Sequence, residues 1–195
     1  MSIQYLFGYG SLINSESRAR TGCSGAALPV RVSGIQRAWN FVDRATRMTY
    51  LGVVLREESV TNGILVSVST ADLPLFDARE AGYTRTKLDP AHVSGWSGQK
   101  IPEGEIWMYL PNEPNCPTPA CPITQSYLDV VLAGSLEFGD SFAAEFVRTT
   151  ENWNCPWIDD RAAPRYVRAL QNVPPAKYAE LDRILSENGK SLRPK

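Results

Sequence analysis

The stretch QYLFGYGSL, residues 4–12, breaks an apolar run with Gly-Tyr-Gly-Ser before apolar residues resume. The run from Tyr5 to Gly8 is typical of a first β-strand, and a strand that only ends needs a single turn residue. Two glycines around a tyrosine instead predict a loop, because glycine permits positive φ and close approach of another group to the backbone. Successive amides of such a loop form a concavity that suits an anion or a polarised oxygen. The alternative is a tight turn or bulge after an edge strand.

The composition is that of a globular domain. The 195 residues are 43% hydrophobic and 21% charged, which predicts one domain over residues 1–195. A net charge of −1 with scattered arginines argues against a nucleic-acid or membrane-surface partner. The sequence has no apolar run that would span a bilayer and no signal-peptide pattern at its start. We therefore expect a cytoplasmic protein, whose oligomeric state the sequence leaves open.

Metal-based and nucleophile-based chemistry find little support in the sequence. Its four cysteines, Cys23, Cys116, Cys121 and Cys155, include no CxxC pair, since Cys116 and Cys121 have four residues between them. A structural zinc site needs four Cys or His ligands, typically in close pairs, so we expect no metal site. The single histidine, His92, lies in a stretch rich in turn residues with no nucleophile elbow nearby, and is predicted to lie on the surface.

The order of predicted elements indicates an α+β fold. Strands are predicted at residues 5–8, 28–42, 51–56, 63–69, 83–88 and 104–110, and helices at 71–80, 123–138, 141–150 and 175–187. The strand at 28–42 is predicted to break at Ser33-Gly34, and Thr61-Asn62-Gly63 is read as a turn signal between the strands at 51–56 and 63–69. Strands first and helices later predict a mixed sheet curled toward a small β-barrel with helices packed outside. From about residue 151 we expect a C-terminal helical extension, in which an aromatic loop around Trp153 and Trp157 covers the core.

Glu80 occupies an unfavourable place for a carboxylate. On the predicted helix, Leu73, Phe76 and Glu80 are three and four residues apart, so they share one face. Glu80 then lies among apolar side chains at the C-terminal end, where the helix dipole favours cations and partial burial raises a carboxyl pKa. A carboxylate held there is a candidate general base. From the residues alone, an ion pair with Arg79 or Arg85 explains the position equally well.

The loop after the first strand and the segment around Glu80 together resemble the γ-glutamylcyclotransferase superfamily. The loop contributes Tyr9, Gly10, Ser11 and Leu12, and the later segment contributes Glu80, Gly82, Tyr83 and Arg85. The stretch YLDVVLAGSLEFGDSFAAEFVRTT, residues 127–150, also resembles the helical tail of ChaC-type members. The resemblance implies a small mixed α/β barrel with a cavity, and neither a metal nor an organic cofactor.

The resemblance also implies a reaction. Family substrates are γ-glutamyl amino acids, γ-glutamylamines or glutathione, and the products are 5-oxoproline and a free amine. Applied to this chain, the Tyr9–Leu12 turn would cradle a small γ-glutamyl substrate through its amides, and Glu80 would be the acid/base residue. Tyr83 would be a cavity wall or hydroxyl donor, with core packing as the alternative. The substrate carboxylate has three candidate partners, Arg37, Arg44 and Arg85.

Two other functions fit the same residues. One is a non-catalytic module that binds a small molecule or a protein through the cavity. The other is a related acyl-transfer enzyme in which an external amine or water attacks. A carboxylate among apolar side chains favours an enzyme, because a binding module gains nothing from it, and formation of 5-oxoproline separates the cyclotransferase from the acyl-transfer enzyme.

Overall fold

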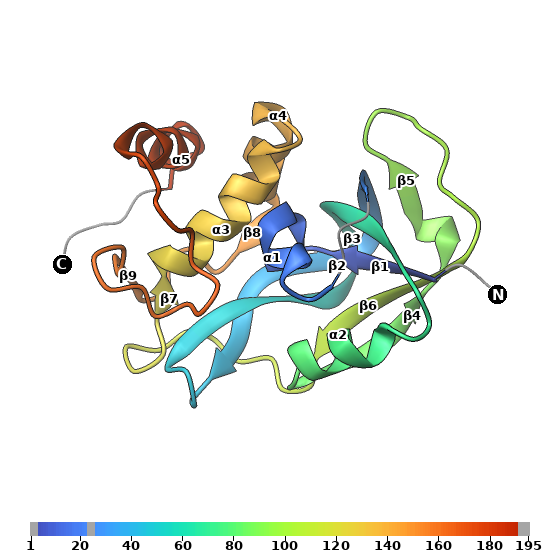
Figure 1. The fold of residues 1–195 in the computed structure, drawn as a ribbon, viewed down its shortest axis with the longest axis horizontal. Coiled ribbons are helices and arrows are strands. Elements are labelled where there is room, and N and C mark those ends of the chain that lie inside the picture. Colours follow the sequence, from blue (N-terminus) through green and yellow to red (C-terminus); the bar gives the residue numbers. More distant parts are fainter. Residues whose placement is uncertain (1–3, 23–25, 191–195) are drawn as a thin grey trace.

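The computed structural model describes residues 4–22 and 26–190, with strands early in the chain and helices late (Figure 1). The strands are β1 (Gln4–Gly8), β2 (Ala27–Asp43), β3 (Met48–Val68), β4 (Tyr83–Leu88), β5 (Val93–Gly95), β6 (Glu105–Pro111), β7 (Ile123–Thr124), β8 (Thr150–Glu151) and β9 (Trp157–Ile158). The helices are α1 (Ser15–Ala19), α2 (Leu73–Arg79), α3 (Gln125–Leu136), α4 (Asp140–Thr149) and α5 (Pro175–Glu187), with short 3₁₀ helices η1 (Ser11–Ile13) and η2 (Pro90–His92). This order confirms the predicted α+β class.

The nine strands found in the described residues form one mixed sheet. Its main path runs β4-β6-β1-β3-β2-β5. The first strand, β1, pairs antiparallel with β3 and parallel with β6. The long β2–β3 hairpin provides the central pairing, and β7, β8 and β9 extend the sheet beyond it. The two edge strands, β4 and β5, follow each other in the chain and are separated only by Asp89 and η2.

Two hydrophobic clusters lie on opposite faces of the sheet. In β1, Leu6 packs into one cluster and Phe7 into the other, as the alternation of side chains along a strand requires. The smaller cluster receives side chains from all six strands of the main path, including Leu88 of β4 and Val93 of β5. Because both edge strands share this cluster, the sheet curls around it as a small open barrel. The larger cluster contains buried residues of α2, α3, α4 and α5, so the helices pack outside.

One predicted boundary is wrong, because the strands expected at 51–56 and 63–69 are both parts of β3. The residues read as a turn signal, Asn62 and Gly63, are instead core residues. The Asn62 side chain is fully buried, and its Oδ1 accepts a hydrogen bond from Nη2 of Arg37 at 2.8 Å. A Cβ at Gly63 would lie 2.5 Å from the aromatic ring of Phe7 in β1. Glycine is therefore needed there for packing between strands rather than for a turn.

The other predicted elements lie close to their predicted positions, whereas α1, β5, β8 and β9 were not predicted. Strand β4 and helix α5 have the predicted bounds. Ser33 and Gly34, where a break was predicted, form a β-bulge inside a continuous β2. Helix α3 begins at Gln125 because the two preceding residues pair with the sheet as β7. Helix α2 ends at Arg79, which leaves Glu80 as its C-terminal cap.

The other expected features can be placed on this fold. Trp153 is buried, and its ring meets that of Trp39 edge-on with centroids 5.5 Å apart, so its loop covers the core as predicted. His92 is exposed, also as predicted. Cys23 lies outside the described residues. Among the residues that the structure describes, no cluster of His, Cys, Asp and Glu suited to a metal ion is found. In the same part of the chain, each helix is too short or too polar to cross a membrane.

Candidate functional site

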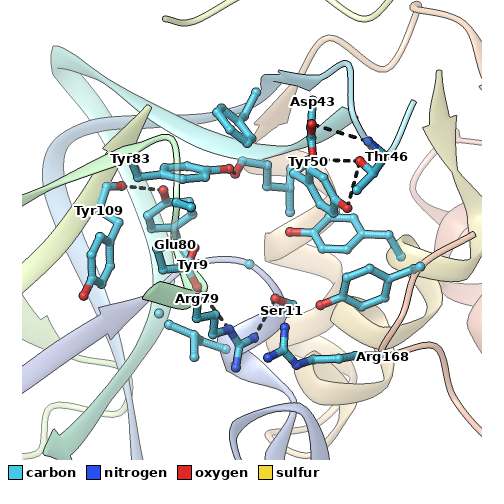
Figure 2. A pocket seen from close by; sticks show the side chains of 18 of the residues that line it. Tyr9, Ser11, Asp43, Thr46, Tyr50, Arg79, Glu80, Tyr83, Tyr109 and Arg168 are labelled. Carbon is cyan, nitrogen blue, oxygen red and sulfur yellow. Dashed lines mark hydrogen bonds and ion pairs between the residues drawn. The ribbon is translucent and has the colours of Figure 1, made fainter. Parts of the chain in front are cut away.

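A cavity of about 280 Å³ lies where the end of β1, the end of α2, the β2–β3 turn and the C-terminal segment (residues 159–170) meet (Figure 2). All six predicted site residues line it: Tyr9, Gly10, Ser11, Leu12, Glu80 and Tyr83. The rest of the wall consists of Phe7, Gly8, Phe41, Asp43, Thr46, Tyr50, Leu51, Arg79, Ala81, Tyr109, Tyr127, Tyr166, Val167 and Arg168. The structure thus brings together two motifs that are far apart in the sequence.

The glycines that flank Tyr9 do not adopt positive φ, so that part of the prediction is wrong. Gly10 has φ −132°, and the positive-φ glycines of the described residues lie elsewhere in the chain. Close approach explains both positions. A Cβ at Gly8 would lie 2.7 Å from Cβ of Leu12, and one at Gly10 would lie 2.9 Å from the Tyr127 hydroxyl oxygen. Glycine therefore lets η1 fold back against β1 and lets α3 close over the turn.

Three neighbouring elements hold the Tyr9–Leu12 turn in place. From α1, Nη1 of Arg18 donates to the Leu12 carbonyl at 2.9 Å. From the end of α2, Nη2 of Arg79 donates to Oγ of Ser11 at 2.9 Å. Helix α3 approaches so closely that a Cβ at Gly134 would lie 2.4 Å from the backbone just after η1. These contacts fix the direction in which the turn presents its amides.

The amides of the turn are available to a ligand. Among the described residues, none of the backbone hydrogen bonds has the N–H of Gly10, Ser11 or Leu12 as its donor. The first N–H groups of a helix lack partners within that helix, and η1 presents them beside the cavity. Such a set of donors suits an anion or a developing oxyanion.

Glu80 combines an ion pair with a perturbed pKa. Its Oε1 lies 3.1 Å from Nε of Arg79, and the side chain keeps 19% of its surface exposed. The ion pair suggested by the sequence is therefore present, while Arg85 pairs with Asp77 instead. Burial nevertheless raises the pKa of Glu80 above its ordinary value, against the opposing charges of Arg79 and Arg168. The raised pKa makes this carboxylate a stronger base than an exposed one.

Gly82 fixes the chain between Glu80 and Tyr83. It has φ +93°, and a Cβ at this position would lie 2.5 Å from the Phe41 ring. Both the backbone conformation and the available space therefore require glycine. The turn that results sends Glu80 and Tyr83 into the same cavity.

Tyrosine hydroxyls crowd the cavity without providing a base. Burial raises the pKa of Tyr9 and Tyr83 well above the ordinary value, so both hydroxyls stay protonated at neutral pH. Tyr83 donates to the Leu51 carbonyl at 2.9 Å, and Tyr9 donates to the Tyr109 carbonyl. Their hydroxyls are committed to the backbone, and the two side chains act as walls.

The arginines near the cavity differ from those expected. Arg37 is fully buried and hydrogen-bonds inside the core, Arg44 lines a separate hollow, and Arg85 pairs with a carboxylate of α2. None of these three lines the cavity, so their expected role at the substrate carboxylate is not supported. The arginines in the wall are Arg79 and Arg168.

Sequence reasoning also missed an aromatic part of the wall. The Tyr127 ring meets those of Tyr50 and Tyr166 edge-on, with centroids 5.0 and 4.9 Å apart. Tyr127 follows the helical apolar pattern of α3, and such a pattern marks a packing face rather than a binding site. Tyr166 and Arg168 follow no pattern that marks a site, because a distant contact brings their segment here.

One family model matches more than half of the chain. It is described as gamma-glutamyl cyclotransferase, AIG2-like, and matches residues 6–127. The matched residues contain the Tyr9–Leu12 turn, Glu80 and Tyr83, whereas the C-terminal segment lies beyond them. A search of curated proteins found no match.

Solved structures share the fold at low sequence identity. A protein described as gamma-glutamyl cyclotransferase is 14% identical with a TM-score of 0.55, over 93% of this chain and 99% of that chain. An uncharacterized protein from Homo sapiens is 14% identical with a TM-score of 0.56, over the same shares. YkqA from Bacillus subtilis is 16% identical with a TM-score of 0.55, over 77% of this chain and 56% of that chain. At such identities the likeness concerns the fold alone.

Proposed function

Because the chain belongs to the AIG2-like gamma-glutamyl cyclotransferase family, we propose that it converts a γ-glutamyl compound to 5-oxoproline and a free amine or amino acid. One observation carries this proposal. The Glu80 carboxylate, with its raised pKa, lines the same small cavity as the unpaired amides of the Tyr9–Leu12 turn. A base and a set of oxyanion donors are the two groups that an intramolecular aminolysis needs.

Glu80 is the general acid/base in this mechanism. The α-ammonium of the substrate gives a proton to the Glu80 carboxylate, which frees the nitrogen lone pair. That nitrogen attacks the γ-carbonyl carbon, and a five-membered ring forms with a negative charge on the former carbonyl oxygen. Collapse of this intermediate breaks the bond from the γ-carbon to the leaving nitrogen, which takes the first proton from Glu80. The regenerated carboxylate then accepts the second proton of the ring nitrogen and passes it to the released amine, which leaves as an ammonium. No atom from water or another reactant is required.

The Tyr9–Leu12 amides stabilise the charge that develops on the γ-oxygen. Preorganised N–H donors of this kind contribute most where water is excluded, and eight of the twenty residues in the wall are aromatic. The buried Tyr9 and the half-buried Tyr83 limit the conformations that the glutamyl chain can adopt. Holding the amine near its own carbonyl supplies a further part of the rate enhancement.

The test is an assay for 5-oxoproline with glutathione, γ-glutamyl amino acids and γ-glutamylamines. We expect the wild type to form product from at least one of these and Glu80→Gln to lose about 10²- to 10⁴-fold in kcat. Glu57→Gln is the matched control, because Glu57 is an exposed residue of β3 outside the cavity. Glu80→Gln should still fold, since glutamine has the same shape.

Each contrary result has a definite meaning. Substantial activity in Glu80→Gln would overturn the role of this residue. Products that contain the glutamyl group without ring closure would favour acyl transfer to an external amine or water. No product from any substrate class would favour a non-catalytic binding module, in which Glu80 serves only as the partner of Arg79.

A further inference from the structure

The C-terminal segment, residues 159–170, is docked onto the start of α3 by a buried carboxylate. Asp160 accepts hydrogen bonds from the Ser126 amide at 2.7 Å, the Ser126 hydroxyl at 2.6 Å and the Arg165 amide at 2.9 Å. The amide of Tyr166 donates in turn to Oγ of Ser126 at 3.3 Å. These bonds fix the path of the backbone up to the cavity.

Tyr166 closes the cavity and positions the residues that follow. Its buried side chain packs edge-on against Tyr127 and Tyr50, with ring centroids 4.9 and 6.1 Å away. The Ala169 amide donates to the Tyr166 carbonyl at 3.0 Å, so residues 166–169 form a turn. Arg168 lies on this turn, and Figure 2 shows its side chain extending into the cavity. The packing of Tyr166 and the hydrogen bonds of the backbone therefore place the Arg168 guanidinium in the cavity.

Among the described residues, Arg168 differs from the other charged residues of the wall in making no hydrogen bond or ion pair with the protein. Arg79 is paired with Glu80 and donates to Ser11. The Asp43 carboxylate accepts hydrogen bonds from the amides and the hydroxyl of the β2–β3 turn.

These charges form a pattern that matches a zwitterion. A half-buried guanidinium without a partner favours a carboxylate, which it can bind through two parallel hydrogen bonds. The Glu80 carboxylate in the same cavity favours an ammonium group. A ligand with both groups on one carbon atom would satisfy both residues at once, and the α-carbon of a γ-glutamyl compound is such an atom.

We propose that Arg168 binds the α-carboxylate of the substrate, and that the site thereby selects compounds with a free α-amino acid head. The identity of the ligand rests on the proposed function, whereas carboxylate binding rests on the position of Arg168. In this arrangement the α-ammonium lies toward Glu80, and the γ-carbonyl remains free to reach the Tyr9–Leu12 amides. Arg168 is then a substrate-binding residue that orients the internal nucleophile.

The test compares two lactams that differ only in the carboxylate. Binding of 5-oxoproline and of 2-pyrrolidinone is measured by calorimetry for the wild type, Arg168→Ala, Arg168→Lys and Arg165→Ala. We expect the wild type to bind 5-oxoproline more tightly than 2-pyrrolidinone by about 10- to 100-fold, the value of a charge-assisted hydrogen bond. Arg168→Ala should lose this preference, and Arg168→Lys should keep part of it.

Arg165→Ala is the matched control, because Arg165 is exposed on the same segment and outside the cavity. It should bind both lactams as the wild type does. Thermal unfolding of Arg168→Ala should match that of the wild type, since no described protein group bonds to this side chain. The proposal is overturned if the wild type binds the two lactams equally or binds neither, or if Arg168→Ala keeps the preference.

The two proposals can fail separately. Turnover by both the wild type and Arg168→Ala with the same KM would leave the cyclotransferase in place and remove the role of Arg168. An Arg168-dependent preference for 5-oxoproline without turnover of any γ-glutamyl compound would support the carboxylate site and remove the catalytic proposal.

Discussion

Two regions of the cavity wall differ in how clearly the local sequence indicates them. The first consists of the Tyr9–Leu12 turn and the end of α2 with Glu80. It lies within the residues matched by the family model and carries short motifs. The second is the C-terminal segment with Tyr166 and Arg168, which lies beyond the match. Both regions contribute polar groups to the same cavity of about 280 Å³.

The difference reflects what each region requires of its own residues. In the first, glycines at positions 8, 10 and 82 are needed because neighbouring atoms leave no space for a Cβ, so the sequence carries a local sign of the structure. In the second, the backbone is held by Asp160 and Ser126, which are far apart in the chain. A contact of that kind leaves no local pattern. Local sequence patterns therefore indicate the region of the turn and Glu80, whereas they give no sign that the C-terminal segment lines the same cavity.

The largest effect is expected from a substitution that separates α3 from the Tyr9–Leu12 turn of the first region. Gly134→Val places a side chain where a Cβ would already lie 2.4 Å from the Asn14 backbone. Overpacking against backbone should lower the free energy of unfolding by about 3 kcal/mol, as measured by urea denaturation. Ala144→Val in α4 is the control, because Ala144 is only half-buried. An equal loss in both variants would contradict the close approach.

Substitution of Asp160 should release the C-terminal segment from the start of α3. Asp160→Ala leaves the amides of Ser126 and Arg165 without their acceptor, which should lower the free energy of unfolding by about 2 kcal/mol. The adjacent and exposed Asp159 provides the control Asp159→Ala. Hydrogen exchange should rise at Tyr166 and its neighbours, and 5-oxoproline binding should weaken as in Arg168→Ala. Unchanged exchange at Tyr166 would show that Asp160 does not hold the segment.

Local patterns predicted most of the fold. The bounds of β4 and α5 were predicted as they are found, because alternation and helical periodicity are properties of the elements themselves. The long strand β3 was divided because Asn62-Gly63 looks like a turn. Whether such a pair forms a turn depends on its partners, and here Asn62 is bound by the buried Arg37 while Gly63 faces the Phe7 ring.

Only part of the cavity wall was predicted from the sequence. Glu80 and the Tyr9–Leu12 turn were found from short motifs, and both line the cavity. The reason given for Gly10 was partly wrong, since the Tyr127 hydroxyl rather than a positive φ requires glycine there. The sequence offered Arg37, Arg44 and Arg85 for the substrate carboxylate, and none of these lines the cavity. Arg168 could not be found from local patterns, because it reaches the cavity only after the C-terminal segment has docked on α3.

A change of charge within the first region should alter its pH dependence. The positive charge of Arg79 lowers the pKa of Glu80, although burial outweighs it. Arg79→Gln should therefore raise this pKa further and move the acid limb of kcat/KM to higher pH, because the base must be ionised. Arg85→Gln is the control, since Arg85 pairs with Asp77 outside the cavity. An acid limb that stays in place or moves to lower pH would show that another group is the base.

The smallest expected effect is a change in how the free energy of unfolding depends on pH. Burial raises the pKa of Glu80 in the folded protein, so the folded state binds this proton more tightly than the unfolded chain. The stability that this proton contributes is fully present below the ordinary carboxyl pKa of about 4.3. It is lost as the pH rises through the raised pKa of the folded state. The free energy of unfolding of Glu80→Gln relative to the wild type should therefore increase slightly from pH 4 to pH 7.

Urea denaturation of both proteins across this pH range measures the effect, and the exposed Glu57→Gln should show no such trend. A difference that stays constant or falls with pH would mean that the ion pair with Arg79 outweighs burial. The same measurement on Arg168→Ala should give a trend of the opposite sign, because the charge of Arg168 lowers the pKa of Glu80 and its loss makes ionisation of Glu80 more costly as the pH rises. The two residues differ in how the fold affects their charge. Burial opposes ionisation of Glu80, whereas Arg168 keeps its charge at the half-exposed edge of the cavity, where we propose that it binds a ligand carboxylate.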